Sequence, residues 1–280
     1  MNPEQRPVTP VTIIRPPRGF SSLGLNDLWI YRELLYFLAW RDVKVRYKQT
    51  VLGLAWAIIQ PVGTMVVFSI FFGKLANIPS DGLPYPLFTF VALLPWQLFS
   101  YSLSTASQST VGQSALITKI YCPRLIIPVS SILGGLVDFV VAFGVLVIMM
   151  FAYSEIPAWR IVFLPGFIIM ALATALGVGL WLAALNVHYR DVRYTLPFLT
   201  QFWLFISPVA YPASMVPGKW QWIYGVNPMA GVVEGFRWAI LGNAPAPGIM
   251  LFISIAVTVV ILISGVYYFR RMDRTFADVV

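Results

Sequence analysis

Residues 40–50 read Trp-Arg-Asp-Val-Lys-Val-Arg-Tyr-Lys-Gln-Thr, a basic and aromatic run that directly precedes the apolar segment beginning at Val51. Basic residues beside a long apolar segment mark the end of a membrane span and its cytoplasmic side. The composition agrees, because 59% of the 280 residues are hydrophobic and 11% are charged, whereas a soluble domain carries about 25% charged residues. The sequence therefore predicts an integral membrane protein.

Six apolar segments after this run are long enough to cross a bilayer as helices, which takes roughly 20 residues. They do not alternate with the period of two that barrel strands show, and a helix satisfies its own backbone groups within lipid. The predicted fold is therefore all-α, with six transmembrane helices within residues 51–270. The expected spans cover approximately residues 51–72, 87–106, 125–151, 161–185, 195–214 and 249–269.

The distribution of basic residues predicts the orientation. Most of the 19 Lys and Arg residues lie before the first span, in two of the loops and in the C-terminal tail. The loops on the opposite face hold only Lys74, Arg160, Lys219 and Arg237. This asymmetry predicts that both termini are cytoplasmic. We expect a cytoplasmic tail at residues 1–25, an amphipathic interface helix at 26–50 and a cytoplasmic C-terminal tail at 271–280.

The segment between the fifth and sixth spans, residues 215–248, is too polar to cross the membrane and is unusually aromatic. Asn227-Pro228 is typical of a helix start, and helical spacing places Glu234 and Arg237 on the polar side of an amphipathic helix. We expect one or two short helices that dip into the outer leaflet. Their aromatic residues form either an interfacial rim or a gate above a transport pathway. The candidate gate residues are Trp220, Trp222, Tyr224, Phe236 and Trp238.

The sequence shows no pattern typical of an enzyme. It has no HExxH motif and no cluster of Cys and His, so we expect no catalytic residue and no metal site. Gly73-Lys74 and Gly218-Lys219 lack the other residues of a phosphate-binding loop. Asp138 is the one carboxylate deep in an expected span, where a charge is costly unless it is paired or faces water. It is either a structural or solvated residue or the proton relay of a secondary transporter of a small solute.

Four motifs, in order along nearly the whole chain, resemble those of one family. They are Arg41-Asp-Val-Lys-Val-Arg-Tyr-Lys-Gln-Thr-Val-Leu-Gly-Leu-Ala-Trp-Ala-Ile-Ile-Gln-Pro61, Lys119-Ile-Tyr-Cys-Pro-Arg-Leu-Ile-Ile-Pro128, Ala184-Leu-Asn-Val-His-Tyr-Arg-Asp-Val-Arg193 and Asn227-Pro-Met-Ala-Gly-Val-Val-Glu-Gly-Phe-Arg-Trp238. The sequence is similar to permease subunits of type-2 ABC exporters for polysaccharides and polyol phosphates, the group that includes O-antigen exporters.

This resemblance implies a homodimer of the chain in the cytoplasmic (inner) membrane, paired with two copies of a cytoplasmic ATPase subunit. ATP and Mg would then bind to that partner, and the chain itself would need no cofactor. The helix at 26–50 would be an interface helix, and residues 108–124 would act as a coupling helix. The candidate contacts with the ATPase are Arg41, Lys44, Arg46, Tyr47, Lys119, Tyr121 and Arg124.

The substrate implied by the resemblance is a lipid-linked glycan, either O-antigen-like or a polymer of the teichoic-acid or capsule type. Sugar rings stack their C–H faces on aromatic rings, and amides and hydroxyls hydrogen-bond to sugar hydroxyls. The candidate pore residues are Trp56, Gln60, Trp96, Gln97, Phe99, Tyr101, Gln201, Trp203 and Tyr211.

Overall fold

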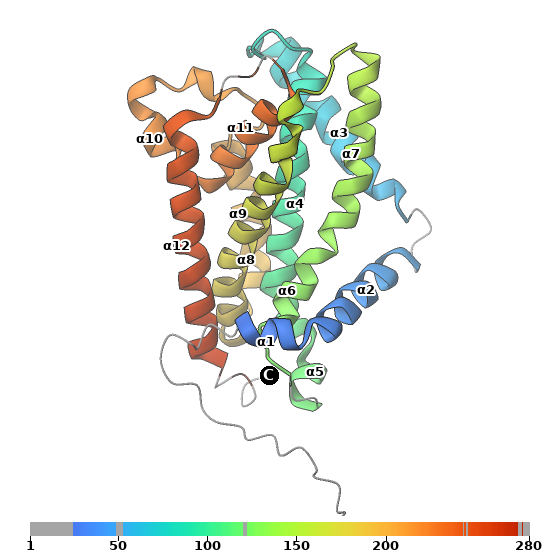
Figure 1. The fold of residues 1–280 in the computed structure, drawn as a ribbon, viewed down its shortest axis with the longest axis vertical. Helices are drawn as coiled ribbons and strands as arrows, with labels where there is room; N and C mark the ends of the chain where they lie inside the picture. Colours follow the sequence, from blue (N-terminus) through green and yellow to red (C-terminus); the bar gives the residue numbers. More distant parts are fainter. Residues whose placement is uncertain are drawn as a thin grey trace, which may run out of the picture.

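The computed structural model describes residues 25–48, 53–119, 122–242, 244, 246–273 and 276. Every regular element in this part of the chain is a helix, as predicted (Figure 1). The α-helices are α1 (Leu25–Ile30), α2 (Arg32–Lys48), α3 (Ala55–Phe68), α4 (Tyr85–Gly112), α5 (Ser114–Lys119), α6 (Ile126–Leu133), α7 (Gly135–Ala152), α8 (Leu164–His188), α9 (Val192–Ile206), α10 (Gln221–Tyr224), α11 (Pro228–Ile240) and α12 (Gly248–Asp273). Shorter elements are the π-helix η2 (Ser69–Leu75) and the 3₁₀ turns η3 (Trp159–Phe163), η4 (Ala213–Met215) and η5 (Gly218–Trp220).

Among the residues that the structure describes, five helical stretches are long and apolar enough to cross a membrane. They correspond to the first, second, third, fourth and sixth predicted spans, so the sequence prediction of these five is confirmed by length and composition. Their bounds are Ala55–Leu75, Tyr85–Gly112, Ile126–Ala152, Trp159–His188 and Gly248–Asp273.

The fifth predicted span differs, because α9 ends at Ile206 after 15 residues. At about 1.5 Å per residue such a helix extends roughly 22 Å, less than the bilayer core of about 30 Å. Ser207 is extended, with φ −87° and ψ 149°, as the residue before a proline prefers to be. The prediction of one helix over residues 195–214 is therefore wrong beyond Ile206, and a sixth span stays a prediction.

Helix α4 is the centre of the bundle and contacts α3, α6, α7, α8, α9 and α11. Its Phe90 and Phe99 are completely buried. Helices α8 and α12 also lie in close contact, since a Cβ added to Gly265 would lie 2.2 Å from the carbonyl oxygen of Gly177. Large side chains from α4 and small residues between α8 and α12 thus build the core that holds the other helices in place.

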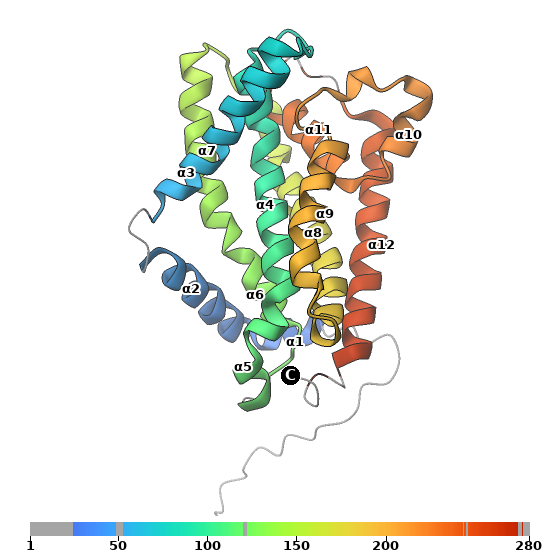
Figure 2. The same ribbon diagram turned by 180° about the vertical axis from the view of Figure 1, so that it is seen from behind.

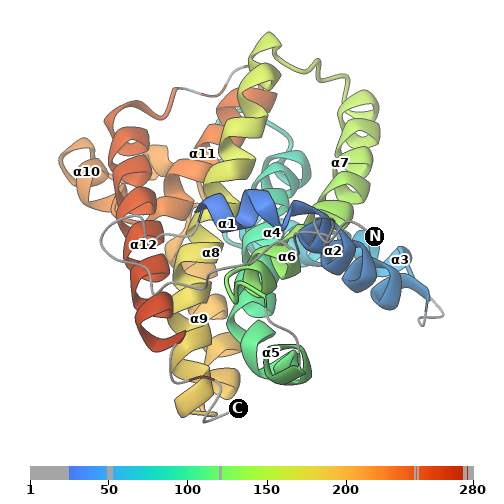
Figure 3. The ribbon, with the colours of Figure 1, turned by 60° about the horizontal axis from the view of Figure 1, so that its bottom comes forward.

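The short helices separate to the two ends of the bundle (Figure 1, Figure 3). Helices α1, α2 and α5 and the last turn of α12 lie at one end, which we call the α5 end, and α10 and α11 lie toward the opposite, α10 end. The predicted interface helix at 26–50 is two helices separated at Tyr31. Helix α2 contacts α6 and slants away from the bundle toward the start of α3.

Candidate functional site

A polar groove of about 490 Å³ is lined by residues of α2, α3, α4, α7 and α9. Figure 2 shows the arrangement of these helices. The polar side chains of the groove follow the helical repeat. Gln97, Tyr101 and Ser104 succeed one another on one face of α4, and Gln60 and Thr64 lie one turn apart on α3. Side chains spaced by three or four residues share one face of a helix. Both helices are candidate membrane spans, so the groove collects polar groups that would be costly against lipid.

Most of the predicted pore residues lie at this groove. Two of them, Trp56 and Gln60, come from α3, and Gln201 comes from α9. The structure brings together six of the nine candidates, which are Trp56, Gln60, Trp96, Gln97, Tyr101 and Gln201. Their role as glycan contacts stays a prediction.

The other three pore candidates do not line the groove. Phe99 is completely buried and packs edge-to-face on Trp203, with ring centroids 4.9 Å apart. The indole Nε1 of Trp203 donates a hydrogen bond to Asn227 Oδ1 over 2.8 Å. The hydroxyl groups of Tyr211 and Tyr224 are 2.8 Å apart. Trp203 and Tyr211 therefore connect the end of α9 to α10 and α11. The sequence alone could not distinguish this packing role from pore lining.

An ion pair lies at the end of the groove nearest α2. Arg46 Nη2 is 2.6 Å from Asp138 Oδ2, and the Tyr47 hydroxyl donates a hydrogen bond to the same carboxylate. The guanidinium carbon of Arg46 lies 4.2 Å from the centre of the Tyr101 ring. Gly135 makes room for that ring, because an added Cβ would lie 2.7 Å from Tyr101 Cδ1. The cluster joins α2 to α4 and α7.

Asp138 therefore has a close charged partner. This fits a structural role for Asp138, the alternative to a proton relay. Burial and the neighbouring carboxylate raise the pKa of Tyr47 well above its usual range, so its hydroxyl stays protonated and remains a donor. Arg46 and Tyr47 were predicted to contact an ATPase, and the structure turns both toward a transmembrane helix instead of leaving them fully exposed. Sequence reasoning gave no signal for this pairing, since Tyr47 and Asp138 are 91 residues apart.

A second ion pair is buried in α11, where the sequence predicted a polar face. Arg237 is 2% exposed, and its Nη1 lies 2.7 Å from Glu234 Oε1. The guanidinium also donates to the carbonyl oxygen of Val209 over 3.0 Å and lies 3.6 Å from the centre of the Phe88 ring. The predicted short helix is present, but the expectation that its polar side is exposed is wrong, because α11 packs between α4, α8 and α12. The pair satisfies backbone groups of the non-helical segment after α9.

The predicted helix start at Asn227 is confirmed, because its side chain accepts a hydrogen bond from the Met229 amide over 3.1 Å. The gate candidates around it divide into two groups. Trp220 and Trp222 are 52% and 55% exposed, whereas Phe236 is completely buried. Tyr224 and Trp238 are half-buried. Of these five residues, only Trp220 and Trp222 are exposed enough to belong to an aromatic rim at the membrane interface.

The model of the ABC-2 type transporter family matches residues 33–241. The chain belongs to this family. Three relatives cover most of its length. The O-antigen export system permease protein RfbA of Myxococcus xanthus is 29% identical over 258 residues, which is 91% of this chain and 98% of the relative.

A second O-antigen permease and a polysialic acid transport protein are also similar to this chain. The protein of the same name from Klebsiella pneumoniae is 26% identical over 251 residues, or 88% of this chain and 95% of the relative. The polysialic acid transport protein KpsM of Escherichia coli is 24% identical over 242 residues, or 84% of this chain and 91% of the relative.

Of the remaining ATPase-contact candidates of this ABC-2 chain, the ones with described side chains are Arg41, Lys44 and Arg124. Arg41 pairs with its neighbour Asp42 over 2.8 Å, and Lys44 is exposed. Arg124 pairs with Asp273 at the end of α12 over 2.9 Å. Tyr121 and the side chain of Lys119 lie outside the described residues. Partner contact stays a prediction for the whole set.

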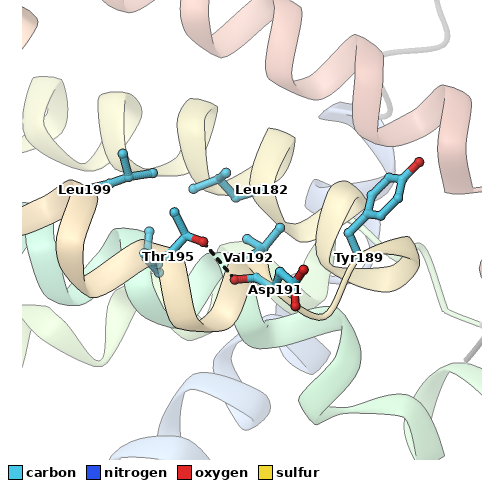
Figure 4. Close-up of a pocket in the computed structure, with 7 residues that line it drawn as sticks. Leu182, Tyr189, Asp191, Val192, Thr195 and Leu199 are labelled. Atoms are coloured by element: carbon cyan, nitrogen blue, oxygen red, sulfur yellow. Dashed lines mark hydrogen bonds between the residues drawn. The ribbon is translucent and has the colours of Figure 1, made fainter.

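A smaller pocket of about 190 Å³ lies at the turn between α8 and α9 of this ABC-2 chain (Figure 4). Leu182 and Leu199 contribute apolar walls, and the Thr195 hydroxyl donates to the carbonyl oxygen of Asp191 over 3.0 Å. This pocket is smaller than the groove, and four of its seven lining residues are Leu or Val, so it offers less for polar recognition. The groove is the better candidate for the transported molecule.

Proposed function

We propose that this chain is the permease subunit of an ATP-driven exporter that moves a lipid-linked polysaccharide across the cytoplasmic membrane. The observation that supports it most directly is the groove, which combines two tryptophan rings and two glutamine amides on the candidate membrane spans α3 and α4 with a third glutamine amide on α9. The relatives named as O-antigen and polysialic acid exporters support the same substrate class.

The groove suits a polymer that must bind and then move. Trp56 is 54% exposed and offers a ring face to the C–H groups of a sugar. The amides of Gln60, Gln97 and Gln201 can each donate and accept hydrogen bonds with sugar hydroxyls. Such contacts repeat at each sugar and are individually weak. The polysaccharide can therefore advance in small steps, because it never has to dissociate from a single tight binding site.

ATP hydrolysis belongs to a separate subunit in this proposal, since the sequence has no phosphate-binding loop. Two copies of the permease would enclose the pathway between them, with one ATPase subunit below each. The α5 end carries the basic residues of α2, which supports its placement at the cytoplasmic face. Helices α2 and α5 are then the elements nearest the ATPase, and α10 and α11 would form the outer gate.

The proposal is tested by co-expressing the chain with its ATPase subunit and measuring glycan export in proteoliposomes. We expect export only with ATP, and we expect Trp56→Ala and Gln60→Ala to lower the initial rate by about tenfold, as loss of roughly 1.4 kcal/mol would. Val67→Ala is the matched control, because Val67 is exposed on the same helix but does not line the groove.

Two results would contradict the proposal. Export driven by an ion gradient without ATP would favour the secondary transporter that Asp138 first suggested. Equal export by the Trp56, Gln60 and Val67 variants would remove the groove from the pathway.

A further inference from the structure

The groove carries almost no net charge. Among the described residues that line it, Arg46 and Asp138 are the only charged ones. Their side chains are 36% and 21% exposed and lie 2.6 Å apart, so each neutralises the other. The remaining polar groups of the lining are amides, hydroxyls and aromatic rings, and its other walls are apolar, such as Leu93, Phe139 and Leu204.

We propose that this groove selects polysaccharides with uncharged repeating units and that Asp138 is the residue that sets this specificity by cancelling the charge of Arg46. The inference rests on the proposed function and narrows its substrate class. It separates two alternatives that the sequence left open, an uncharged O-antigen-like chain and an anionic polymer of the teichoic-acid or capsule type.

Electrostatics gives the reason. An anionic group that enters a groove with apolar walls loses hydration, and it needs compensating positive charge or donors. A cleft attracts an anion when its charges are mainly positive, whereas Arg46 and Asp138 act as a close dipole whose field falls quickly with distance. An uncharged sugar carries no such cost, because its hydroxyls exchange water for the amides of Gln60, Gln97 and Gln201.

The structure also fixes the position of the two charges. Tyr47 donates to Asp138, and Tyr101 lies against the Arg46 guanidinium. Arg46 is thus held beside its counter-ion, where it cannot turn freely toward a passing anion. Removing the carboxylate, or adding a lysine elsewhere in the groove, should leave one positive charge uncompensated.

The test uses the full permease–ATPase complex in lipid nanodiscs and two probes that differ only in charge. These are an oligosialic acid and its carboxyl-reduced, uncharged derivative, both with the same fluorescent end label. Binding is measured by anisotropy. We expect the uncharged probe to bind wild type at least about tenfold more tightly, because the carboxylates of oligosialic acid lose hydration in the groove without gaining a positive partner.

Two variants test the cause. Gln97→Lys adds a positive charge without touching the Arg46–Asp138 pair, and Gln97→Met removes the same amide without adding charge. We expect Gln97→Lys to bind oligosialic acid at least about fivefold more tightly than Gln97→Met does, by the same charge attraction. Asp138→Asn should likewise strengthen the binding of oligosialic acid relative to the uncharged probe, because it leaves Arg46 without its counter-ion.

The inference is overturned if wild type binds oligosialic acid as tightly as the reduced probe, or if Gln97→Lys and Gln97→Met behave alike. If neither probe binds any variant while the complex still exports its polymer, the groove is not the glycan site and the proposed role of the groove fails as well.

Discussion

At the scale of single residues, the ion pair between Glu234 and Arg237 joins parts of the chain that the sequence did not connect. Glu234 and Arg237 are spaced like an exposed pair on a helix surface, yet Arg237 is 2% exposed. Burial lowers the pKa of the Arg237 guanidinium, and the Glu234 carboxylate opposes this shift. Glu234 Oε1 also accepts from the Ala213 amide over 3.2 Å. The pair therefore joins α11 to the segment that follows α9.

Arg237→Leu should destabilise the protein strongly, because it leaves the buried Glu234 carboxylate without its charged partner and the Val209 carbonyl group without its guanidinium donor. We expect a loss of about 3 kcal/mol in the free energy of unfolding, the usual cost of breaking a buried ion pair. Thermal unfolding of the detergent-solubilised protein measures it. Lys74→Leu, at an exposed basic residue, is the control, and equal midpoints for both variants would contradict the role of the pair.

At the scale of elements, contact between α8 and α12 depends on small residues. Gly177 and Gly265 face each other, and the hydroxyl groups of Thr174 and Thr258 are 3.1 Å apart further along the same contact. Small residues let helix backbones approach closely within a membrane. The position of α12 relative to the bundle, and of α11 packed on it, follows from this contact.

Gly265→Ala should therefore separate α8 from α12. The added Cβ would lie 2.2 Å from the Gly177 carbonyl oxygen, a backbone atom that cannot move alone. We expect a loss of about 2 kcal/mol in stability, as overpacking usually costs. Gly144→Ala is the matched control, because a Cβ there meets nothing within 4 Å. Gly144→Ala should leave the stability of the protein unchanged or raise it by up to about 1 kcal/mol. Similar losses of stability in both variants would argue against the close contact.

At the scale of the whole molecule, the bundle separates a basic end from an aromatic end. The α5 end presents Arg41 and Lys44 on α2, while Arg46 on the same helix pairs with Asp138 at the groove. A movement of α2 would therefore change the charged end of the groove directly. This arrangement suggests how a partner at the α5 end could influence the pathway.

Replacing Arg41 and Lys44 together by Ala should reduce co-purification of the ATPase subunit by several-fold or uncouple its ATP hydrolysis from export. Membrane insertion should be unchanged, because neither residue contacts Asp138. Pull-down of the partner and ATPase activity in proteoliposomes measure the effect. Lys74→Ala, on the other side of the predicted topology, is the control. A fully coupled complex in the double variant would remove these residues from the interface.

The sequence by itself determined the fold class, five of the spans and the helix start at Asn227, because hydropathy, span length and capping depend on neighbouring residues only. It also pointed to Gln60, Gln97 and Trp56 as one set, since their polarity or aromaticity stands out within apolar helices.

Only the tertiary structure decided which charges meet and which aromatic residues face the groove. Arg46 reaches Asp138, and Trp203 reaches Asn227, through contacts between elements that are distant in the chain. Such pairings depend on how whole helices pack, and a residue pattern within one helix cannot specify the helix that lies opposite. The same limit applies to Arg237, whose charge indicated an exposed surface until the packing of α11 against α4 and α8 buried it.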